Sequence, residues 1–396
     1  MKLFFKIDFK QKKKTIKYCL GLVFISLITL GLVELAILYP LSLGFARFNA
    51  SQNIFEQHNL VDVYFSISKQ NSNKHKWSIV IVDVTNCHNR NSLAQYITMI
   101  DSVSPRVIGI DVIFKTNECD NDSLIQVLSK TENLVLASRL INNDSYNWEK
   151  FERIETSFDI FSSISGFVNI VSENGYSSVA RYFTNKYLKY NNDKDSIQSF
   201  ASKIAQVAYK EEGEGYKNLE NRNKLKEYIN FHVCDSFKVI PANDLKENLH
   251  FLQDNVVLIG NYNDVSDEHV TPINIKMEGV KIHAYILATI EEQKFINQMS
   301  NRGARIIALF FILLTVFIKS KIRKKENTGW SLLVPLCQVV FLVLGLFIGY
   351  CVFIYGNYYI PLIYTLIGVS IAGFSYKFML FFLQCTRRFF RTSKIK

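Results

Sequence analysis

Four apolar blocks constrain the fold of this 396-residue chain more than any other feature. One block occupies residues 18–38, and three lie near the C-terminus, at residues 302–320, 331–355 and 359–384. Each is close to the ~20 residues that an α-helix needs to cross a bilayer. The 261 residues between the first block and the others, 39–299, are enough for a folded domain with its own core. We therefore expect one domain held by four transmembrane helices.

Two of the four blocks admit another interpretation. Residues 18–38 could belong to a signal peptide, but its apolar region is usually ~7–15 residues long and precedes a small-residue cleavage site. The segment Gly44–Ala46 resembles such a site poorly. The most apolar part of the second block, Ile306–Ile318, could be a buried core helix. Basic residues flank it at both ends and can reach the membrane surfaces, which favours a span.

The net charge of +11 could indicate a nucleic-acid partner, but its distribution indicates membrane orientation. Residues 1–17, 319–328 and 386–396 carry 17 Lys and Arg against two acidic residues, which leaves a net charge of −4 elsewhere. Four spans place these segments on one side, which the positive-inside rule makes the cytoplasm. We therefore expect a bacterial inner-membrane protein, with basic segments that contact anionic lipid and no nucleic acid. Its cytoplasmic parts would be the tail 1–17, the loop 321–330 and the tail 385–396, and its periplasmic or extracellular part residues 39–299.

Short β-branched runs alternate with helical patterns in residues 39–299. The runs are Ser78–Asp83, Arg106–Ile113, Asn133–Ala137 and Asp254–Gly260. Apolar periodicity predicts helices over 91–104, 122–130, 196–209 and 279–292. This alternation predicts an α/β domain with a mostly parallel sheet and flanking helices. The Asn-Gly pair between the runs 166–171 and 179–183 predicts a hairpin.

Three aspartates are candidate ligand-binding residues. Asp83 and Asp111 end two predicted strands that we expect to be neighbours, and ligands of open α/β sheets bind at that edge. With Asp267 on a later loop, the group could bind a cation or an amine, or the acids could raise one another's pKa. Each acid taken separately could instead cap a helix or accept hydrogen bonds from loop amides.

The histidines do not complete a catalytic or metal site. His283 lies in a predicted helix, where a buried or capping role is more common than that of a base. His232 and Cys234 are spaced to share one strand face, but no second ligand pair follows. The chain also has no nucleophile elbow, phosphate-binding loop or dinucleotide fingerprint. We expect no enzymatic activity, no cofactor and no metal.

Two cysteines are candidates for a disulfide. Cys87 follows the first predicted strand and Cys119 the second, so both fall on one edge of the sheet in an oxidising compartment. A Cys87–Cys119 bond would close a loop of 31 residues and stabilise the domain by about 2–4 kcal/mol. The alternative is two free thiols.

An ordered set of motifs runs through the domain. An opening group combines Ile81–Asp83, Arg90 and Val107–Phe114, and Asn133–Ala137 follows. A middle group consists of Gly166, Asn169, Gly175 and Arg181, and a closing group of Val257–Gly260, Asp267, Thr271–Pro272, Gly279 and His283–Ala284. Over about residues 45–295 this set resembles the second type of CHASE domain, an extracellular sensory module associated with cyclases and histidine kinases. One span before the domain and three after it are also usual for that family.

The resemblance implies a sensor. Its members commonly carry a kinase, cyclase or phosphodiesterase after the last span, whereas 13 residues follow Leu383 here. We therefore expect a receptor-like protein that signals through a separate partner protein, and the resemblance alone implies a possible homodimer. The alternative is a structural or assembly subunit of a cell-envelope complex, with the outward domain as a protein-binding platform.

Overall fold

The computed structural model describes most of the chain and forms two compact units. One unit, called the outer domain here, is Asn53–Ile296. The other, called the helix unit, combines Met1–Gln52 with Asn297–Lys396. The described residues are 9–42, 60–68, 75–87, 89–114, 121–141, 150–151, 153–156, 158–170, 179–189, 192–209, 214–222, 224–262, 264–322 and 333–392.

A seven-stranded sheet forms the centre of the described outer domain. The strand order is β11-β1-β12-β2-β3-β5, and β6 also pairs with β3. Every pairing is parallel except that of β5 with β3. The predicted α/β class with a mostly parallel sheet is therefore confirmed. The strands are β1 (His75–Asp83), β2 (Val107–Asp111), β3 (Leu134–Ile141), β5 (Arg153–Thr156), β6 (Ser165–Phe167), β11 (Ser236–Pro241) and β12 (Val256–Gly260).

The prediction that Asp83 and Asp111 end neighbouring strands is wrong. Strand β12 lies between β1 and β2, and Gly260 is in register with Asp83 on one side and with Asp111 on the other. All five residues of β12 are buried, so this apolar strand is most stable at the centre of the sheet, with a hydrogen-bonded neighbour on each edge. The connection from β1 to β2 therefore skips one strand position.

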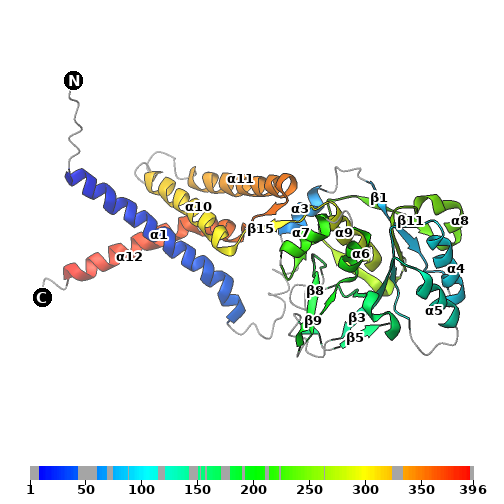
Figure 1. Ribbon diagram of the computed structural model, residues 1–396. Helices are drawn as coiled ribbons and strands as arrows, with labels where there is room; N and C mark the ends of the chain where they lie inside the picture. Colours follow the sequence, from blue (N-terminus) through cyan, green and yellow to red (C-terminus); the bar gives the residue numbers. More distant parts are fainter. Residues whose placement is uncertain are drawn as a thin grey trace, which may run out of the picture. The chain divides into compact units, whose positions relative to one another are not determined.

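Helices cover both faces of the sheet. Figure 1 shows α4, α5 and α8 on one face and α6 and α9 on the other. The first layer packs Leu93, Ile97 and Leu128 into one apolar core with side chains of β1, β2 and β12. Helix α4 begins where the side chain of Asn89 accepts a hydrogen bond of 2.7 Å from the backbone N–H of Ser92. The helices are α4 (Arg90–Asp101), α5 (Asn121–Lys130), α6 (Phe200–Ala208), α8 (Leu245–Asn248) and α9 (Gly279–Glu291).

A glycine lets α6 approach the sheet closely. A Cβ atom on Gly166 of β6 would lie 2.7 Å from the Cα atom of Phe200, the first residue of α6. Backbone atoms cannot yield at that distance, so only glycine fits there. The close approach places the Phe200 ring over the sheet, 5.3 Å from the ring of His283 on α9.

The remaining elements of the domain surround this core. The predicted hairpin is wrong, because β6 joins the central sheet whereas β7 pairs with β10 in a separate ribbon. The turn residues between them lie outside the described part of the chain. The surrounding elements include α3 (Leu60–Ser68), α7 (Glu214–Arg222), β4 (Lys150–Phe151), β7 (Tyr182–Phe183), β8 (Lys186–Lys189), β9 (Asn192–Gln198), β10 (Glu227–Tyr228), β13 (Glu268–Thr271) and β14 (Asn274–Glu278).

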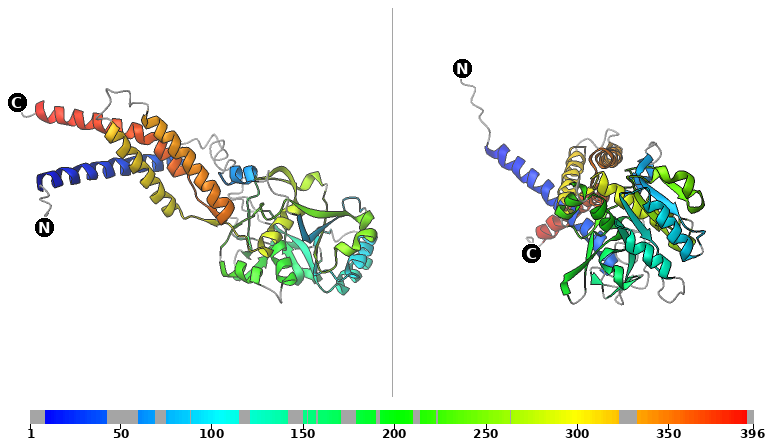
Figure 2. Two further views of the ribbon diagram at one scale, coloured as in Figure 1. Left: turned by 90° about the horizontal axis from the view of Figure 1, so that it is seen from above. Right: turned by 45° about the vertical axis from the view of Figure 1, so that its right-hand side comes forward.

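The helix unit contains four described helices that are long and apolar enough to cross a membrane. Helices α1, α10 and α12 share one buried cluster that includes Val33, Ile312 and Ala372. Figure 2 shows these helices from two further directions. A short parallel pairing joins Asn297–Gln298 (β15) to Tyr358–Tyr359 (β16). The helices are α1 (Phe9–Ser42), α10 (Asn301–Ile322), α11 (Leu333–Gly356) and α12 (Ile363–Thr392).

One ion pair joins the first and second membrane helices. Nε of Arg305 on α10 lies 2.6 Å from Oε1 of Glu34 on α1. The guanidinium also lies over the ring of Tyr364 on α12, 5.6 Å from its centroid. The flanking arginine, which the sequence suggested would reach toward the membrane surface, instead pairs with the acid of the first span. Charges within a span are costly unless paired, so this contact accounts for both residues.

Candidate functional site

Asp83 and Asp111 both lie at the carboxyl edge of the sheet, but their side chains make different contacts. Oδ1 of Asp83 accepts hydrogen bonds from the backbone N–H and the hydroxyl of Thr85, at 2.9 and 2.5 Å. It also accepts one from the N–H of Tyr262, at 3.1 Å. These bonds hold the turn after β1 against the turn after β12. The structure thus places Asp83 in loop support, the alternative that its sequence position left open.

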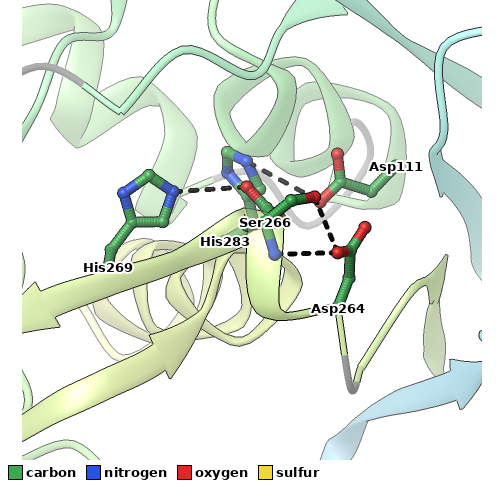
Figure 3. A network of polar contacts seen from close by, with 6 residues as sticks. Asp111, Asp264, Ser266, His269 and His283 are labelled. Carbon is green, nitrogen blue, oxygen red and sulfur yellow. Dashed lines mark hydrogen bonds and ion pairs between the residues drawn. The ribbon is translucent and has the colours of Figure 1, made fainter.

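Asp111 pairs with a histidine that sequence reasoning had treated as structural. Oδ2 of Asp111 lies 3.9 Å from Nε2 of His283, and the two side chains are 10% and 4% exposed. Figure 3 shows the pair, with His269 also drawn. The ring of His283 also has a hydrogen bond with the backbone of Val168, the residue that follows β6. The pair is therefore a nearly buried acid and base that are close but not hydrogen-bonded.

The third predicted acid, Asp267, lies beside this pair, directly after a turn that Asp264 stabilises. Oδ1 of Asp264 accepts hydrogen bonds from the N–H and the hydroxyl of Ser266, at 2.9 and 2.6 Å (Figure 3). Directly after that turn, Asp267 lies with Oδ1 3.3 Å from Nε2 of His269. Its carboxylate covers Gly279, the first residue of α9, where a Cβ atom would lie 2.2 Å from Oδ2. A carboxylate at a helix N-terminus is stabilised by the helix dipole.

The buried pair has strongly shifted proton affinities. Burial, together with the negative charge of Asp267, raises the pKa of Asp111 to about 7. Burial lowers the pKa of His283 to about 4, although Asp267 acts in the opposite direction. An imidazole ordinarily has a higher pKa than a carboxyl group, and in this pair that order is reversed. Between these two values the acid takes up the proton and the imidazole remains neutral.

The structure therefore brings together two of the three predicted acids and adds two histidines. The sequence offered one signal for His283, since it lies four residues after Gly279, on the same helical face. His269 had no such signal, because only the short ribbon of β13 and β14 places it near Asp267. In the part of the chain that the structure describes, no three His, Cys, Asp or Glu side chains converge as a metal site requires.

A second polar contact anchors helix α3. The guanidinium of Arg181 donates two hydrogen bonds to the carboxylate of Asp62 on α3, at 2.8 and 2.6 Å. Arg181 is fully buried and Asp62 is 19% exposed. Sequence reasoning missed Asp62, whose signal is a lone acid inside the otherwise apolar segment Leu60–Phe65. This paired geometry is the one in which an arginine binds a carboxylate most strongly.

The predicted disulfide remains a prediction. Cys87 is partly exposed, and its Sγ lies 3.4 Å from the carbonyl oxygen of Asn89. Cys119 lies outside the described residues. Burial raises the pKa of the Cys87 thiol, which makes it a less reactive thiolate source than an exposed cysteine.

A protein-family model for the CHASE2 domain matches residues 33–318, more than two thirds of the chain. The chain belongs to the CHASE2 family. CHASE2 domains are extracellular sensory domains. Searches of curated proteins and of solved structures gave no significant match. The match begins inside α1 and ends inside α10, so it includes both residues of the Glu34–Arg305 ion pair.

The structure gives the CHASE2-like motif residues physical roles. Asp111 of the opening motif is the acid of the buried pair, and His283 of the closing motif is its base. From the middle motif, the side chain of Asn169 bonds both backbone groups of Leu140, at 2.7 and 3.1 Å. Arg181 from the same motif holds α3. These motif residues of the CHASE2 domain therefore supply the buried polar pair, a side-chain bond to the backbone of β3 and the anchor of helix α3.

Proposed function

We propose that this protein is a membrane receptor that senses a stimulus with its CHASE2 domain and passes a conformational change to its membrane helices. The observation that carries the proposal is the extent of the family match, which joins a sensory domain to the helix on either side of it. A change in the domain can thus reach two helices that are in direct contact with each other.

The chain offers a short covalent path for that change. Helix α9 carries His283 and ends at Glu291, and α10 begins at Asn301. Only residues 292–300 separate the helix that holds the buried pair from a membrane helix. A shift or rotation of α9 is therefore expected to act on α10. Small rigid-body shifts of packed helices are a common form of transmembrane switching.

The Glu34–Arg305 pair supports the next step. It ties α10 to α1, the helix that precedes the domain in the chain. Since both partners lie in apolar helices, a displacement that separates them exposes two charges and is costly. A two-state rearrangement that keeps the pair while changing the packing around it is the expected output.

We further propose the setting in which the receptor works. The basic segments support a bacterial inner membrane, with both described ends of the chain in the cytoplasm and the CHASE2 domain in the periplasm. We propose that the chain is not an enzyme and signals through a separate partner protein, with a homodimer as the signalling form. The groups beside His283 are carboxyls, an imidazole and a phenyl ring, and none of these is a hydroxyl or thiol for it to activate.

The partner can be identified by crosslinking in native membranes. A photo-crosslinking amino acid at Phe347 of α11, which is 62% exposed, would capture a protein that contacts the helix unit. The same amino acid at Ile312, which is fully buried, is the matched control. We expect a kinase, cyclase or transcription regulator from the Phe347 position alone. Capture of envelope-assembly proteins would contradict the receptor and support the structural subunit.

A further inference from the structure

The Asp111–His283 pair has features that a purely structural contact does not need. Two buried side chains, one an acid and one a base, lie 3.9 Å apart without a hydrogen bond between them. Burying an acid and a base without a hydrogen bond between them destabilises a fold, so their presence at the ligand-binding edge of an α/β sheet indicates another role.

The neighbouring groups determine how the pair responds to charge. The turn before β13 contributes Asp267 and β13 itself contributes His269, both of which act electrostatically on His283. On α9, the Nζ of Lys281 lies over the ring of Tyr262 and 3.4 Å from its hydroxyl. At the start of the same helix, Glu278 has one buried carboxylate oxygen without a partner in the described residues.

The other elements around the pair contribute little charge. Asp83 at the end of β1 is held by its own turn. The adjacent strand β12 ends in Gly260, and α6 contributes the ring of Phe200. Besides burial, the charge that raises the pKa of Asp111 is therefore another carboxylate, that of Asp267, which opposes its ionisation.

We propose that Asp111, with His283 as its hydrogen-bond acceptor, is a proton-binding site through which the CHASE2 domain responds to acidification. The inference rests on the proposed receptor function and names its stimulus. One proton from solvent binds a carboxylate oxygen of Asp111 and no bond in the protein breaks. The neutral acid then donates to Nε2 of His283, and the two atoms close from 3.9 Å to hydrogen-bond distance, about 2.7–3.0 Å.

Closing this gap would move two elements toward each other. Asp111 ends β2 and His283 lies on α9, so the new hydrogen bond draws the helix toward the sheet edge. Loss of the negative charge on Asp111 also removes its repulsion of Asp267, whose turn covers the first residue of α9. Both effects act on the helix that leads to α10.

The proton affinities agree with this assignment. Burial and Asp267 raise the pKa of Asp111 to about 7, whereas burial lowers the pKa of His283 to about 4. On acidification from pH 8, the carboxylate therefore takes up the proton before the imidazole does. The neutral imidazole is then the acceptor that the closed pair requires.

The test measures protonation and helix movement in the full-length protein in lipid nanodiscs, with pH as the probe. Infrared difference spectroscopy follows the carbonyl band of a protonated carboxyl between pH 8 and pH 5. We expect a titration near pH 7 that Asp111→Asn abolishes and that Asp267→Asn moves to lower pH. The matched control is Asp83→Asn, at the corresponding end of β1, which should leave the titration unchanged.

Helix movement is followed with spin labels at Leu35 and Ile306, the exposed neighbours of the ion pair. The distance between the labels should differ between pH 8 and pH 6 in the wild-type and Asp83→Asn proteins, and should stay at its pH 6 value in Asp111→Asn.

Three results would overturn the proton site. The first is a carbonyl band that still titrates in Asp111→Asn. The second is a titration midpoint that Asp267→Asn does not change. The third is a distance between the labels at Leu35 and Ile306 that does not depend on pH. If Asp111→Asn does not fold, the Asp267→Asn titration decides, because that side chain is half-exposed and tolerates the change. Failure here leaves the receptor intact, since partner capture at Phe347 does not depend on the stimulus.

Discussion

Replacing Asp111 by asparagine should stabilise the protein above pH 7 and leave its stability unchanged near pH 4. Asparagine keeps the shape of a neutral carboxyl group and cannot ionise. The wild-type carboxylate is forced to ionise in an almost buried position, next to the charge of Asp267. The folded protein therefore carries a cost at alkaline pH that the variant avoids.

The pKa shift gives the size of this effect. The pKa of Asp111 rises from 3.8 to about 7 on folding, and each unit corresponds to about 1.4 kcal/mol, so the full difference is about 4 kcal/mol. The folded state binds the proton more tightly, so the contribution of Asp111 to stability is lowest above pH 7 and increases as the pH falls toward 3.8. For a domain of this size, that difference corresponds to at most about 8–16 °C in melting temperature.

His283 changes stability in the opposite direction. Its pKa falls from 6.5 to about 4 on folding, so its contribution is present above pH 6.5 and is lost as the pH falls through 4. In the wild-type protein the two contributions nearly cancel between pH 6.5 and 4, so stability should increase slightly from pH 7 to 6.5 and then stay nearly level down to pH 4. In Asp111→Asn only the histidine remains, so stability should be level from pH 8 to 6.5 and then decrease.

The assay is thermal unfolding of the detergent-solubilised full-length chain in steps of half a pH unit from 8 to 4, for the wild type, Asp111→Asn and Asp83→Asn. The difference between wild type and Asp111→Asn should disappear toward pH 4. Asp83→Asn, which changes the acid at the corresponding end of β1 and leaves the Asp111–His283 pair intact, should follow the shape of the wild-type profile. An Asp111→Asn protein that melts below the wild type at pH 8 would refute the reasoning.

Three further outcomes are expected. Glu34→Arg or Arg305→Glu alone should weaken the contact between α1 and α10, and the two changes together should restore it. Crosslinking of α1 to α10 measures this contact, and single variants that crosslink like the wild type would make the pair dispensable. Gly166→Ala should cost about 1–3 kcal/mol of stability, because its new Cβ meets backbone atoms of α6, and an unchanged urea midpoint would argue against that close approach. Mass spectrometry before and after reduction should show a bond between Cys87 and Cys119, and alkylation of both thiols without reductant would rule it out.

The apolar pattern predicted the fold class because it depends on local sequence. Buried β-branched runs and helical stripes were visible, and their alternation specified a mostly parallel sheet. The strand order was not visible, because β12 comes from residues 256–260 and inserts between two strands from the first third of the chain. Which strands become neighbours depends on tertiary packing of the covering helices, which no short window contains.

The candidate site was predictable to a similar extent. The rule that ligands bind at the carboxyl edge of a sheet identified Asp83 and Asp111, with Asp267 on a later loop. The structure places Asp111 and Asp267 near each other, whereas Asp83 supports its own turn. His283 joined them only through the packing of α9 against that edge. The Asp62–Arg181 contact was also invisible, since 119 positions separate its partners in the sequence. Side-chain pairs at such separations carry no periodic signal.

The short pairing of β15 with β16 determines which parts of the helix unit can move independently. The N–H of Asn297 donates to the carbonyl oxygen of Asn357, and that of Met299 donates to Tyr359, at 2.8 and 2.9 Å. The first strand leads into α10, and the second connects α11 to α12. A displacement of residue 297 would therefore be transmitted to three helices, α10, α11 and α12, which we expect to move together. Helix α1 packs against α10 and α12 and pairs with α10 through Glu34 and Arg305, so the strength of a signal would depend on how that interface rearranges.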